Sequence, residues 1–494
     1  MNILVLPVIV PLLAASLLLA VPSPRGRFLL AVFSTLATLA INLLIFTQTL
    51  MGKVVTTQLG DWLAPYGITL VADRLTGLML LLSGIVTLVT VINSDATLGA
   101  VRGRFGHHAL LQFLFMGVNM SFLTGDLFNL FVSFEVMLVA SYAVVILGNS
   151  TAQLREGLKY VIINLLLSAV FVVACGFTYG ILGTLNMAQL SVRSSELGSM
   201  PIITALSLLL ALVFATKSAL FPLSFWLPGT YPAPPSAISA FLGALLTKVG
   251  VYALVRLYTL MFPLEAPVVQ PLLLVAACLT MLVGAFGGLS QVRWRHMLSY
   301  ATMASVGFIL FGLALFNTSG FGAMIFYLIS SVVVMFSLFL IAGYAEKLTG
   351  FQDVRVGGML ESSPLLATGF FIAALALIGL PPTSGFIGKF ALVRSAFETG
   401  GSLAVLGVVC VLVASLVTLA VMARVWRWFF WEKHDLQLAQ VPIAMTWTTG
   451  AGVALIVLVT VFSGPVYTFS LATAQQLATP ALYVETVLPE GDLP

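Results

Sequence analysis

The chain has 494 residues, of which 60% are hydrophobic and only 8% are charged. Soluble domains are about 45–50% apolar and about 25% charged, so this chain carries more apolar side chains than one water-soluble core buries. Its formal charge of +4 is spread thinly, without a block of Lys and Arg. This distribution argues against nucleic acid as a partner and points to a membrane protein.

Apolar stretches of about 20 residues recur along most of the chain, and each is long enough to cross a bilayer as a helix. We therefore predict an all-α polytopic membrane protein with about 14 transmembrane helices. The chain starts without the charged region and cleavage site of a signal peptide, so we expect the first span to be retained. The predicted spans are residues 3–21, 28–50, 72–92, 107–123, 127–147, 158–182, 203–225, 236–260, 270–289, 296–316, 321–345, 364–398, 402–428 and 446–474.

The distribution of Lys and Arg predicts the orientation of these spans. When residues near a span end are counted with the adjoining connection, thirteen of the 21 Lys and Arg residues belong to connections that follow odd-numbered spans and five to the other connections, and three lie deep inside spans. Cytoplasmic loops are enriched in Lys and Arg, so the richer side is predicted to be cytoplasmic. Both termini are then predicted on the non-cytoplasmic side of the membrane.

Two spans contain prolines that must interrupt a helix. Pro222 lies in the seventh span, and Pro381 and Pro382 lie in the twelfth. Proline removes a backbone donor and clashes with the preceding turn, and a broken helix in a bilayer requires protein or water around the freed backbone groups. Two breaks five spans apart predict a duplicated five-helix unit, spans 4–8 and 9–13, as in transporters with discontinuous helices. Incidental proline kinks are the alternative.

These features predict one membrane domain over residues 1–494 with four parts. The first three helices occupy residues 1–106, the first five-helix repeat 107–260, the second repeat 261–430, and the last helix with its tail 431–494.

Four ionisable residues lie deep inside predicted spans: Glu135, Lys217, Lys248 and Lys389. Each costs about 2.5–3.5 kcal/mol at a helix centre, so it is expected to face a partner or water. We predict a polar track in which Glu135 pairs with Lys217 and protons pass along water to Lys248 and Lys389. The alternative is a structural ion pair with two lysines that extend to the interface.

Lysine suits such a track because burial disfavours its ammonium form whereas a nearby carboxylate favours it. A change in the distance between the two groups therefore changes the proton affinity of the lysine. Hydroxyl groups beside the charges are candidates for relay support, although small polar residues also serve helix packing. These candidates are Thr216, Ser218, Thr247, Thr383 and Ser384.

The remaining polar residues predict no enzyme chemistry and no cofactor. The sequence lacks a phosphate-binding loop, an HExxH motif, a CxxC pair and a dinucleotide-binding GxGxxG motif, and three scattered cysteines indicate neither a disulfide framework nor a metal site. The histidines lie at span ends or in a loop, so no metal site is predicted from them. Asp73, Arg74 and Asp126 at span ends are predicted to be interfacial anchors.

Several of these residues stand in longer motifs. The chain contains these features in the following order: Glu135, residues 215–228 (ATKSALFPLSFWLP), residues 232–236 (PAPPS), Lys248, residues 295–300 (RHMLSY) and residues 379–386 (GLPPTSGF). They resemble the antiporter-like subunits shared by respiratory complex I and the multi-subunit Mrp-type cation/proton antiporters, over nearly the whole chain. Within this family the chain is most similar to the D-type Mrp subunits, judged by residues 1–11, by residues 128–135 (FNLFVSFE) and by the end after the fourteenth span. The larger A-type subunit has an added C-terminal region, which we expect this chain to lack.

The resemblance implies a 14-helix fold with two inverted repeats. It also implies that Glu135, Lys217, Lys248 and Lys389 are the functional charges of the fifth, seventh, eighth and twelfth spans. One departure is in the tenth span, where relatives often have a histidine and this chain has Ser305. A proton step assigned to that histidine is not carried over.

The expected function is that of a proton-translocating subunit of a hetero-oligomeric Na⁺/H⁺ antiporter in a bacterial plasma membrane, without enzymatic activity of its own. Expected partners are Mrp subunits of the A, B, C, E, F and G types, membrane lipid and transported H⁺, and passage of Na⁺ through this subunit is left open. The alternatives are a proton-pumping subunit of a complex I-type quinone reductase or membrane-bound hydrogenase, a stand-alone transporter, and a structural scaffold. Neighbouring genes distinguish the antiporter from the redox complex.

Overall fold

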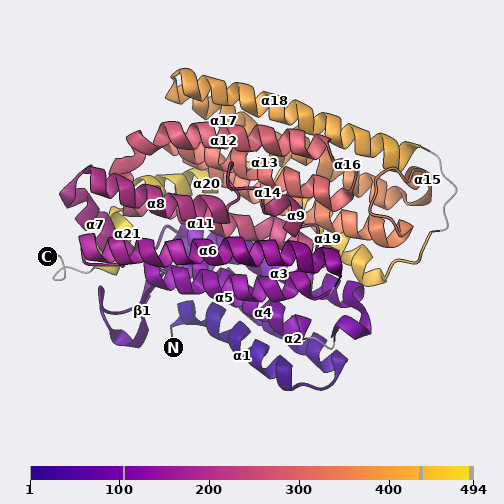
Figure 1. Cartoon of the computed structure of the whole chain (residues 1–494), viewed down its shortest axis with the longest axis horizontal. Coiled ribbons are helices and arrows are strands. Elements are labelled where there is room, and N and C mark those ends of the chain that lie inside the picture. The colour runs from indigo at the N-terminus through magenta and orange to yellow at the C-terminus, as the bar shows by residue number, and fades with distance from the viewer. Residues whose placement is uncertain (1, 104–105, 149, 433–437, 489–494) are drawn as a thin grey trace.

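Long, nearly parallel helices dominate the computed structural model, which describes residues 2–103, 106–148, 150–432 and 438–488 (Figure 1). Their apolar composition and the scarcity of interior proline favour helices of 15 residues or more. The first half of the chain forms α1 (Leu6–Ala20), α2 (Pro24–Leu50), α3 (Arg74–Gly103), α4 (His107–Leu123), α5 (Leu127–Ile146), α6 (Thr151–Leu182), α7 (Met187–Leu197), α8 (Pro201–Lys217), α9 (Leu227–Thr230), α10 (Ser236–Phe241) and α11 (Thr247–Arg256).

The second half continues the same architecture. Its helices are α12 (Ala266–Leu289), α13 (Trp294–Ala314), α14 (Thr318–Thr349), α15 (Met359–Ser362), α16 (Pro364–Ile378), α17 (Ser384–Thr399), α18 (Ser402–Val425), α19 (Ile443–Val461), α20 (Ser463–Ala478) and α21 (Ala481–Val487). Three π-helical segments extend this set, and they are Leu242–Leu246, Leu257–Met261 and Trp426–Trp431.

Eleven helices in the described part of the chain are long and apolar enough to cross a membrane. The helices α4 and α8 have 17 residues each and α16 has 15, so all three are shorter than the 18 residues taken here as membrane-crossing length. A polytopic helical membrane protein is therefore confirmed, whereas the total of 14 spans stays a prediction.

Both predicted helix interruptions are present. Helix α8 ends at Lys217 and the next helical turn begins at Leu227, so Pro222 lies in an open segment. Helix α16 ends at Ile378 and α17 begins at Ser384, on either side of Pro381 and Pro382.

Two local predictions were wrong. The predicted last span, 446–474, is divided into α19 and α20 at Phe462, which has a non-helical φ of −94° and ψ of 24°. Pro465 has no N–H to donate to the preceding turn, which explains the break.

The all-α prediction also missed a hairpin in which β1 (Val55–Gln58) pairs antiparallel with β2 (Thr69–Ala72). Four-residue strands are too short to register in a search for spans of about 20 residues.

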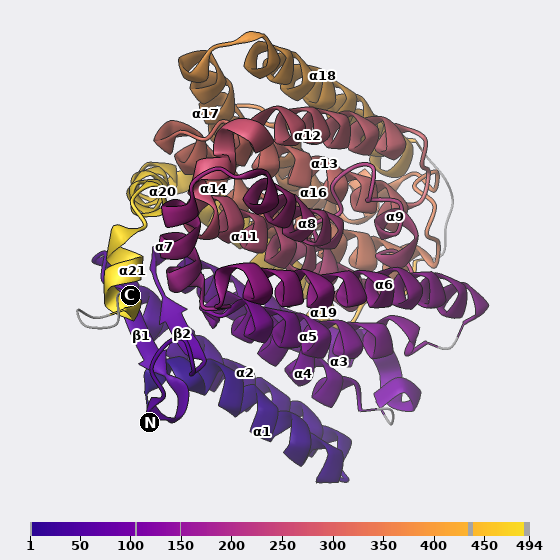
Figure 2. The same cartoon turned by 60° about the vertical axis from the view of Figure 1, so that its left-hand side comes forward.

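Helix α14 forms the centre of the molecule. Its membrane-length segment is entirely buried, and it packs against α10, α13, α16, α17, α19 and α20. A helix that is apolar on every side is stable only where other helices surround it. In Figure 2, α1 and α2 lie at one edge, α17 and α18 at the other, and α14 between them.

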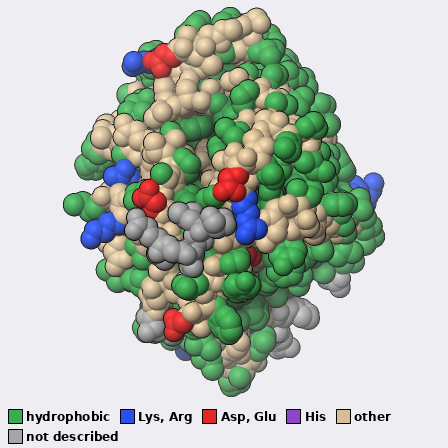
Figure 3. All heavy atoms as spheres, turned by 90° about the vertical axis from the view of Figure 1, so that its left-hand side faces the viewer, with side chains coloured by type: hydrophobic (Ala, Val, Ile, Leu, Met, Phe, Trp, Pro, Cys, Tyr) green, Lys and Arg blue, Asp and Glu red, His purple; other side chains and the backbone are tan. Residues whose placement is uncertain are grey.

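The outer helices present apolar side chains outward. Figure 3 looks onto the end of the bundle near β1 and α7, where charged side chains are sparse and hydrophobic ones cover the flanks. Exposed apolar surface on this scale marks contact with lipid or with other protein chains. Examples are Leu19, Leu29, Leu166, Phe397 and Leu416.

The close packing of α12 on α13 depends on a missing side chain. A Cβ at Gly284 would lie 2.8 Å from both the Ala304 Cα and the Tyr300 carbonyl oxygen, and backbone atoms cannot yield easily. We expect Gly284→Ala to destabilise the protein by about 1–3 kcal/mol through overpacking. The measurement is the midpoint of thermal aggregation of the detergent-solubilised protein.

Gly180→Ala in α6 is the matched control, because a Cβ at this position meets no atom within 4 Å. It should leave the midpoint unchanged or raise it, since alanine favours a helix by about 1 kcal/mol over glycine. Equal losses in the two variants would contradict the packing explanation.

Candidate functional site

Glu135 lies midway along α5 and faces α6. Its carboxylate accepts a hydrogen bond from the hydroxyl of Ser168. The residue is only partly buried in the single chain, whereas Ser168 is buried. A carboxylate among apolar helices with a single hydrogen-bond partner is costly unless water or a further polar group also contacts it.

Lys217 is the last residue of α8, and its side chain is 5% exposed. Its Nζ donates to Asn164 Oδ1 of α6 over 3.1 Å. The Asn164 amide nitrogen in turn donates to the Tyr160 carbonyl, 2.9 Å away, which orients its oxygen toward the lysine. The ammonium group therefore has a neutral partner at the point where α8 ends.

Glu135 and Lys217 interact electrostatically, as the predicted pairing requires, but they are not in direct contact. No ion pair within 4 Å joins these two residues, both of which the structure describes. Instead, each contacts a different polar side chain of α6, and these side chains, Ser168 and Asn164, lie one turn apart on one face. Sequence reasoning missed both, although two polar residues four positions apart in an apolar span are a readable signal.

The open segment after α8 is held by side-chain hydrogen bonds to the backbone. Trp226 Nε1 donates to the Thr216 carbonyl over 3.1 Å, and the Phe221 amide donates to Thr280 Oγ1 over 2.9 Å. A helix break among apolar helices requires such partners because no bulk water is present. The end of α8, and with it Lys217, is thereby fixed in position.

Lys248 is fully buried at the start of α11, directly after the π-helical segment Leu242–Leu246. Its Nζ donates to the Gly243 carbonyl over 3.0 Å. Short π-helical segments are frequent at functional sites. The hydroxyl of Thr247 is also buried and has no hydrogen-bond partner among the described residues, so it is available to water or to a moving proton.

Lys389 of α17 donates hydrogen bonds to backbone carbonyls at the C-terminal end of α16. Its Nζ donates to the carbonyls of Leu377 and Ile378 over 3.0 and 2.8 Å, and to Ser415 Oγ over 3.0 Å. The ammonium also lies 4.4 Å from the centre of the Phe308 ring. The last carbonyls of a helix carry partial negative charge, so this position favours a cation.

Helix α14 connects the surroundings of Lys248 and Lys389. The absence of a side chain at Gly243 allows Phe339 of α14 to approach, since a Cβ there would lie 2.5 Å from its ring. On the other side, Ser330 of α14 hydrogen-bonds Ser384 of α17 over 2.9 Å. The two lysine-bearing helices are therefore supported by one buried helix.

The candidate relay hydroxyls have different environments. Those of Thr216, Ser218 and Thr383 donate to backbone carbonyls within three or four residues, an arrangement that serves local structure. Thr247 is unpartnered within the described structure, and Ser384 bonds a second hydroxyl. The last two are therefore better placed than the first three to exchange a proton.

A further buried pair escaped the sequence analysis. Arg256 makes two hydrogen bonds to Asp73, over 2.7 and 2.6 Å, and a third to Thr76. Asp73, predicted to be an interfacial anchor, is 2% exposed, and Arg256 is 4% exposed. The prediction failed because the partners are 183 residues apart and only tertiary packing brings them together.

The three lysines share one electrostatic property. Within the described ranges, none is within 4 Å of a carboxylate, and each Nζ donates to neutral oxygen atoms. A buried lysine whose hydrogen-bond partners are neutral can gain or lose its proton when its surroundings change. The four charged residues are not part of the one group of three metal-ligating side chains found in the described chain.

Comparison with known proteins identifies a family and similar membrane proteins. Residues 124–418 match the family described as NADH:quinone oxidoreductase/Mrp antiporter, TM. The chain is 37% identical to the D-type subunit of the Na⁺/H⁺ antiporter of Alkalihalophilus pseudofirmus, over 99% of this chain and 100% of that protein. It is 41% identical to the D-type subunit of the Na⁺/H⁺ antiporter of Bacillus subtilis, over 88% of each.

A solved structure extends the likeness to the whole fold. One chain in the structure of the Mrp complex from Dietzia sp. superposes with a TM-score of 0.91 at 26% identity, covering 99% of this chain and 100% of that one. The family match covers more than half of the chain and contains all four charged positions. The chain therefore belongs to the transmembrane family of NADH:quinone oxidoreductases and Mrp antiporters.

Proposed function

We propose that this chain is the D-type, proton-translocating subunit of a hetero-oligomeric Na⁺/H⁺ antiporter. The observation that carries the proposal is similarity over 88% or more of the chain to two proteins named as D-type subunits of such antiporters. The buried lysines with neutral partners are consistent with proton movement, and the expected site residues remain Glu135, Lys217, Lys248 and Lys389.

The proposed proton route begins between α5 and α6. Ser168 and Asn164 form a polar line from Glu135 to Lys217, and water completes the gaps that side chains do not span. From Lys217 the route continues to Lys248 and then past α14 to Lys389. Thr247, Ser330 and Ser384 are the hydroxyls best placed to assist along this part.

The finer architecture is part of the same proposal. We expect 14 spans, with inverted repeats over spans 4–8 and 9–13, within the predicted parts 1–106, 107–260, 261–430 and 431–494. The interruptions after α8 and α16 support this arrangement, because each falls in a predicted repeat. The expected location is a bacterial plasma membrane with both termini on the non-cytoplasmic side, and the partners are Mrp subunits of the A, B, C, E, F and G types.

A redox role is the second candidate. The matching family includes NADH:quinone oxidoreductases, and a proton-pumping subunit of such a complex requires the same buried charges. Neighbouring genes for flavin and iron–sulfur subunits would favour the redox complex, whereas genes for small antiporter subunits would favour the antiporter.

The central test is the Lys217→Ala substitution. Na⁺-dependent proton movement is measured in inverted vesicles from a host without its own antiporters, with this chain alone, its complete gene cluster, and the cluster carrying the substitution. We expect activity only from the intact cluster and at least a roughly tenfold loss in the variant, because the proton-binding amine is gone. Assembly is checked by co-purification of the other subunits.

Full antiport by the Lys217→Ala cluster would reject the lysine route. Activity of the chain alone would instead identify a stand-alone transporter. Inactivity of every cluster, despite normal assembly, would favour the redox complex.

A second test alters the partner of Lys217 and not the lysine itself. Asn164→Asp places a carboxylate at the position that Asn164 Oδ1 now occupies, 3.1 Å from Nζ. An opposite charge in contact favours the ammonium form. We therefore expect slow antiport at neutral pH that recovers as the pH rises, because a higher pH is needed to remove the more tightly held proton.

Asn119→Asp is the matched control, since Asn119 is also buried but hydrogen-bonds Ser83 and the Pro7 carbonyl, away from the lysines. It should keep the pH profile of the unchanged protein even if it lowers the amount assembled. An identical shift in both variants would show that the effect comes from burying a carboxylate and not from Lys217.

A further inference from the structure

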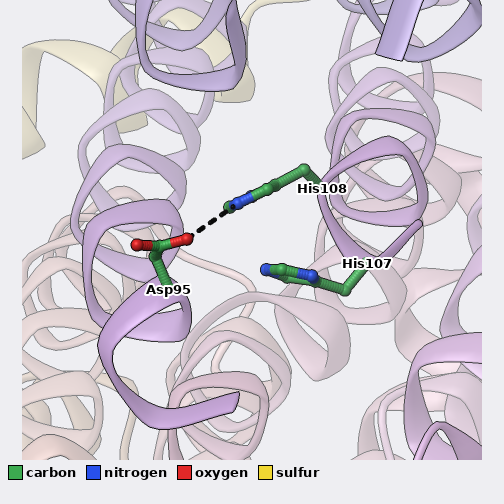
Figure 4. Close-up of side chains that lie close together, drawn as sticks. All are labelled: Asp95, His107 and His108. Atoms are coloured by element: carbon green, nitrogen blue, oxygen red, sulfur yellow. Dashed lines mark hydrogen bonds and ion pairs between the residues drawn. The ribbon is translucent and has the colours of Figure 1, made fainter. Parts of the chain in front are cut away.

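Three side chains capable of binding a metal meet where α3 approaches the start of α4. Asp95, His107 and His108 each offer one ligand atom, and these atoms lie within 4.8 Å of one another. Figure 4 shows both imidazole rings directed toward the Asp95 carboxylate. His108 Nε2 lies 3.4 Å from Asp95 Oδ1, and the two ring centres are 3.8 Å apart.

The histidines are buried without the partners that buried polar groups normally have. His107 and His108 are each 3% exposed. Neither nitrogen of His107 has a hydrogen-bond partner within the described residues, and neither does His108 Nδ1. An unpaired buried polar group costs about 1–3 kcal/mol, so three such atoms at one place point to a missing ligand.

We propose that Asp95, His107 and His108 form a binding site for a divalent transition metal of the Zn²⁺ class. Two neutral imidazoles and one carboxylate are a donor set typical of zinc sites in which water completes the coordination. The Asp95 side chain is 48% exposed, which leaves an entry path and an open position for that water.

The geometry requires a small adjustment on binding. Ligand atoms of a tetrahedral zinc ion lie about 3.3 Å apart, given metal–ligand distances near 2.1 Å. The separation of up to 4.8 Å therefore has to close by about 1.5 Å. The exposed carboxylate supplies most of this movement, because the two histidines are confined by their burial.

One nearby charge opposes the metal. Arg27, near the start of α2, interacts electrostatically with both imidazole rings, and its Nε donates to the Val21 carbonyl over 2.7 Å. Asp95 is the only carboxylate in the ligand group, so the site holds one negative charge against this cation. Removing the Arg27 charge should consequently tighten metal binding.

Bound metal would join the end part of α3 to the first turn of α4. These helices also pack against α2 and α1, respectively, so the ion would tie the N-terminal helices to the first predicted repeat. The site shares no residue with the lysine route, and the proposal does not depend on the antiporter assignment.

The test is a zinc titration of the full chain, purified in detergent with its co-purifying subunits and stripped with a chelator. Zinc uptake is measured by competition with a chromophoric chelator, and Co²⁺ replaces Zn²⁺ to report tetrahedral coordination by its visible absorption. Asp95→Asn, His107→Ala and His108→Ala each remove one ligand. His296→Gln is the matched control, a histidine at the start of α13 outside the group.

We expect the unchanged protein and His296→Gln to bind one more zinc ion per chain than the three ligand variants do. Any zinc that a ligand variant still binds at this site should be held with an affinity at least about tenfold lower. Arg27→Gln should bind more tightly. If a histidine variant fails to fold, Asp95→Asn still tests the proposal, because the Asp95 side chain is about half exposed. Equal zinc binding by all variants, or no tetrahedral cobalt spectrum, would overturn the proposal and leave buried water as the partner of the imidazoles.

Discussion

The need to satisfy backbone groups at two interrupted helices governs this structure. Where α8 and α16 end among apolar neighbours, no bulk water is present to bond the freed carbonyls. Lys389 donates to the last two carbonyls of α16, and Trp226 donates to Thr216 near the end of α8. The same interruptions that create a backbone problem therefore also hold cations at defined places inside the bundle.

The partners of those cations determine what the site can do. Asp73 and Arg256 form a close bidentate pair, which fixes both charges and suits a structural role. The three lysines instead donate to amide, hydroxyl and carbonyl oxygen atoms. Neutral partners hold a lysine in place without permanently compensating its charge, so its protonation stays responsive to nearby change.

Two regions of the molecule serve different purposes in this view. Around α14, tightly packed helices bring the lysine-bearing segments together and exclude lipid from them. At the junction of α3 and α4, the Asp95, His107 and His108 group lies beside the N-terminal helices and remains accessible through Asp95. The proposed ion route and the proposed metal site therefore lie in separate places.

The sequence by itself determined the membrane class, the positions of the helix breaks and the four unusual charges, because hydropathy, proline and intramembrane charge are local properties. Tertiary structure decided which groups meet. It separated Glu135 from Lys217 by the polar face of α6, joined Asp73 to Arg256, and brought Asp95 to His107 and His108. Such contacts depend on the rotation and packing of whole helices, which no local pattern specifies.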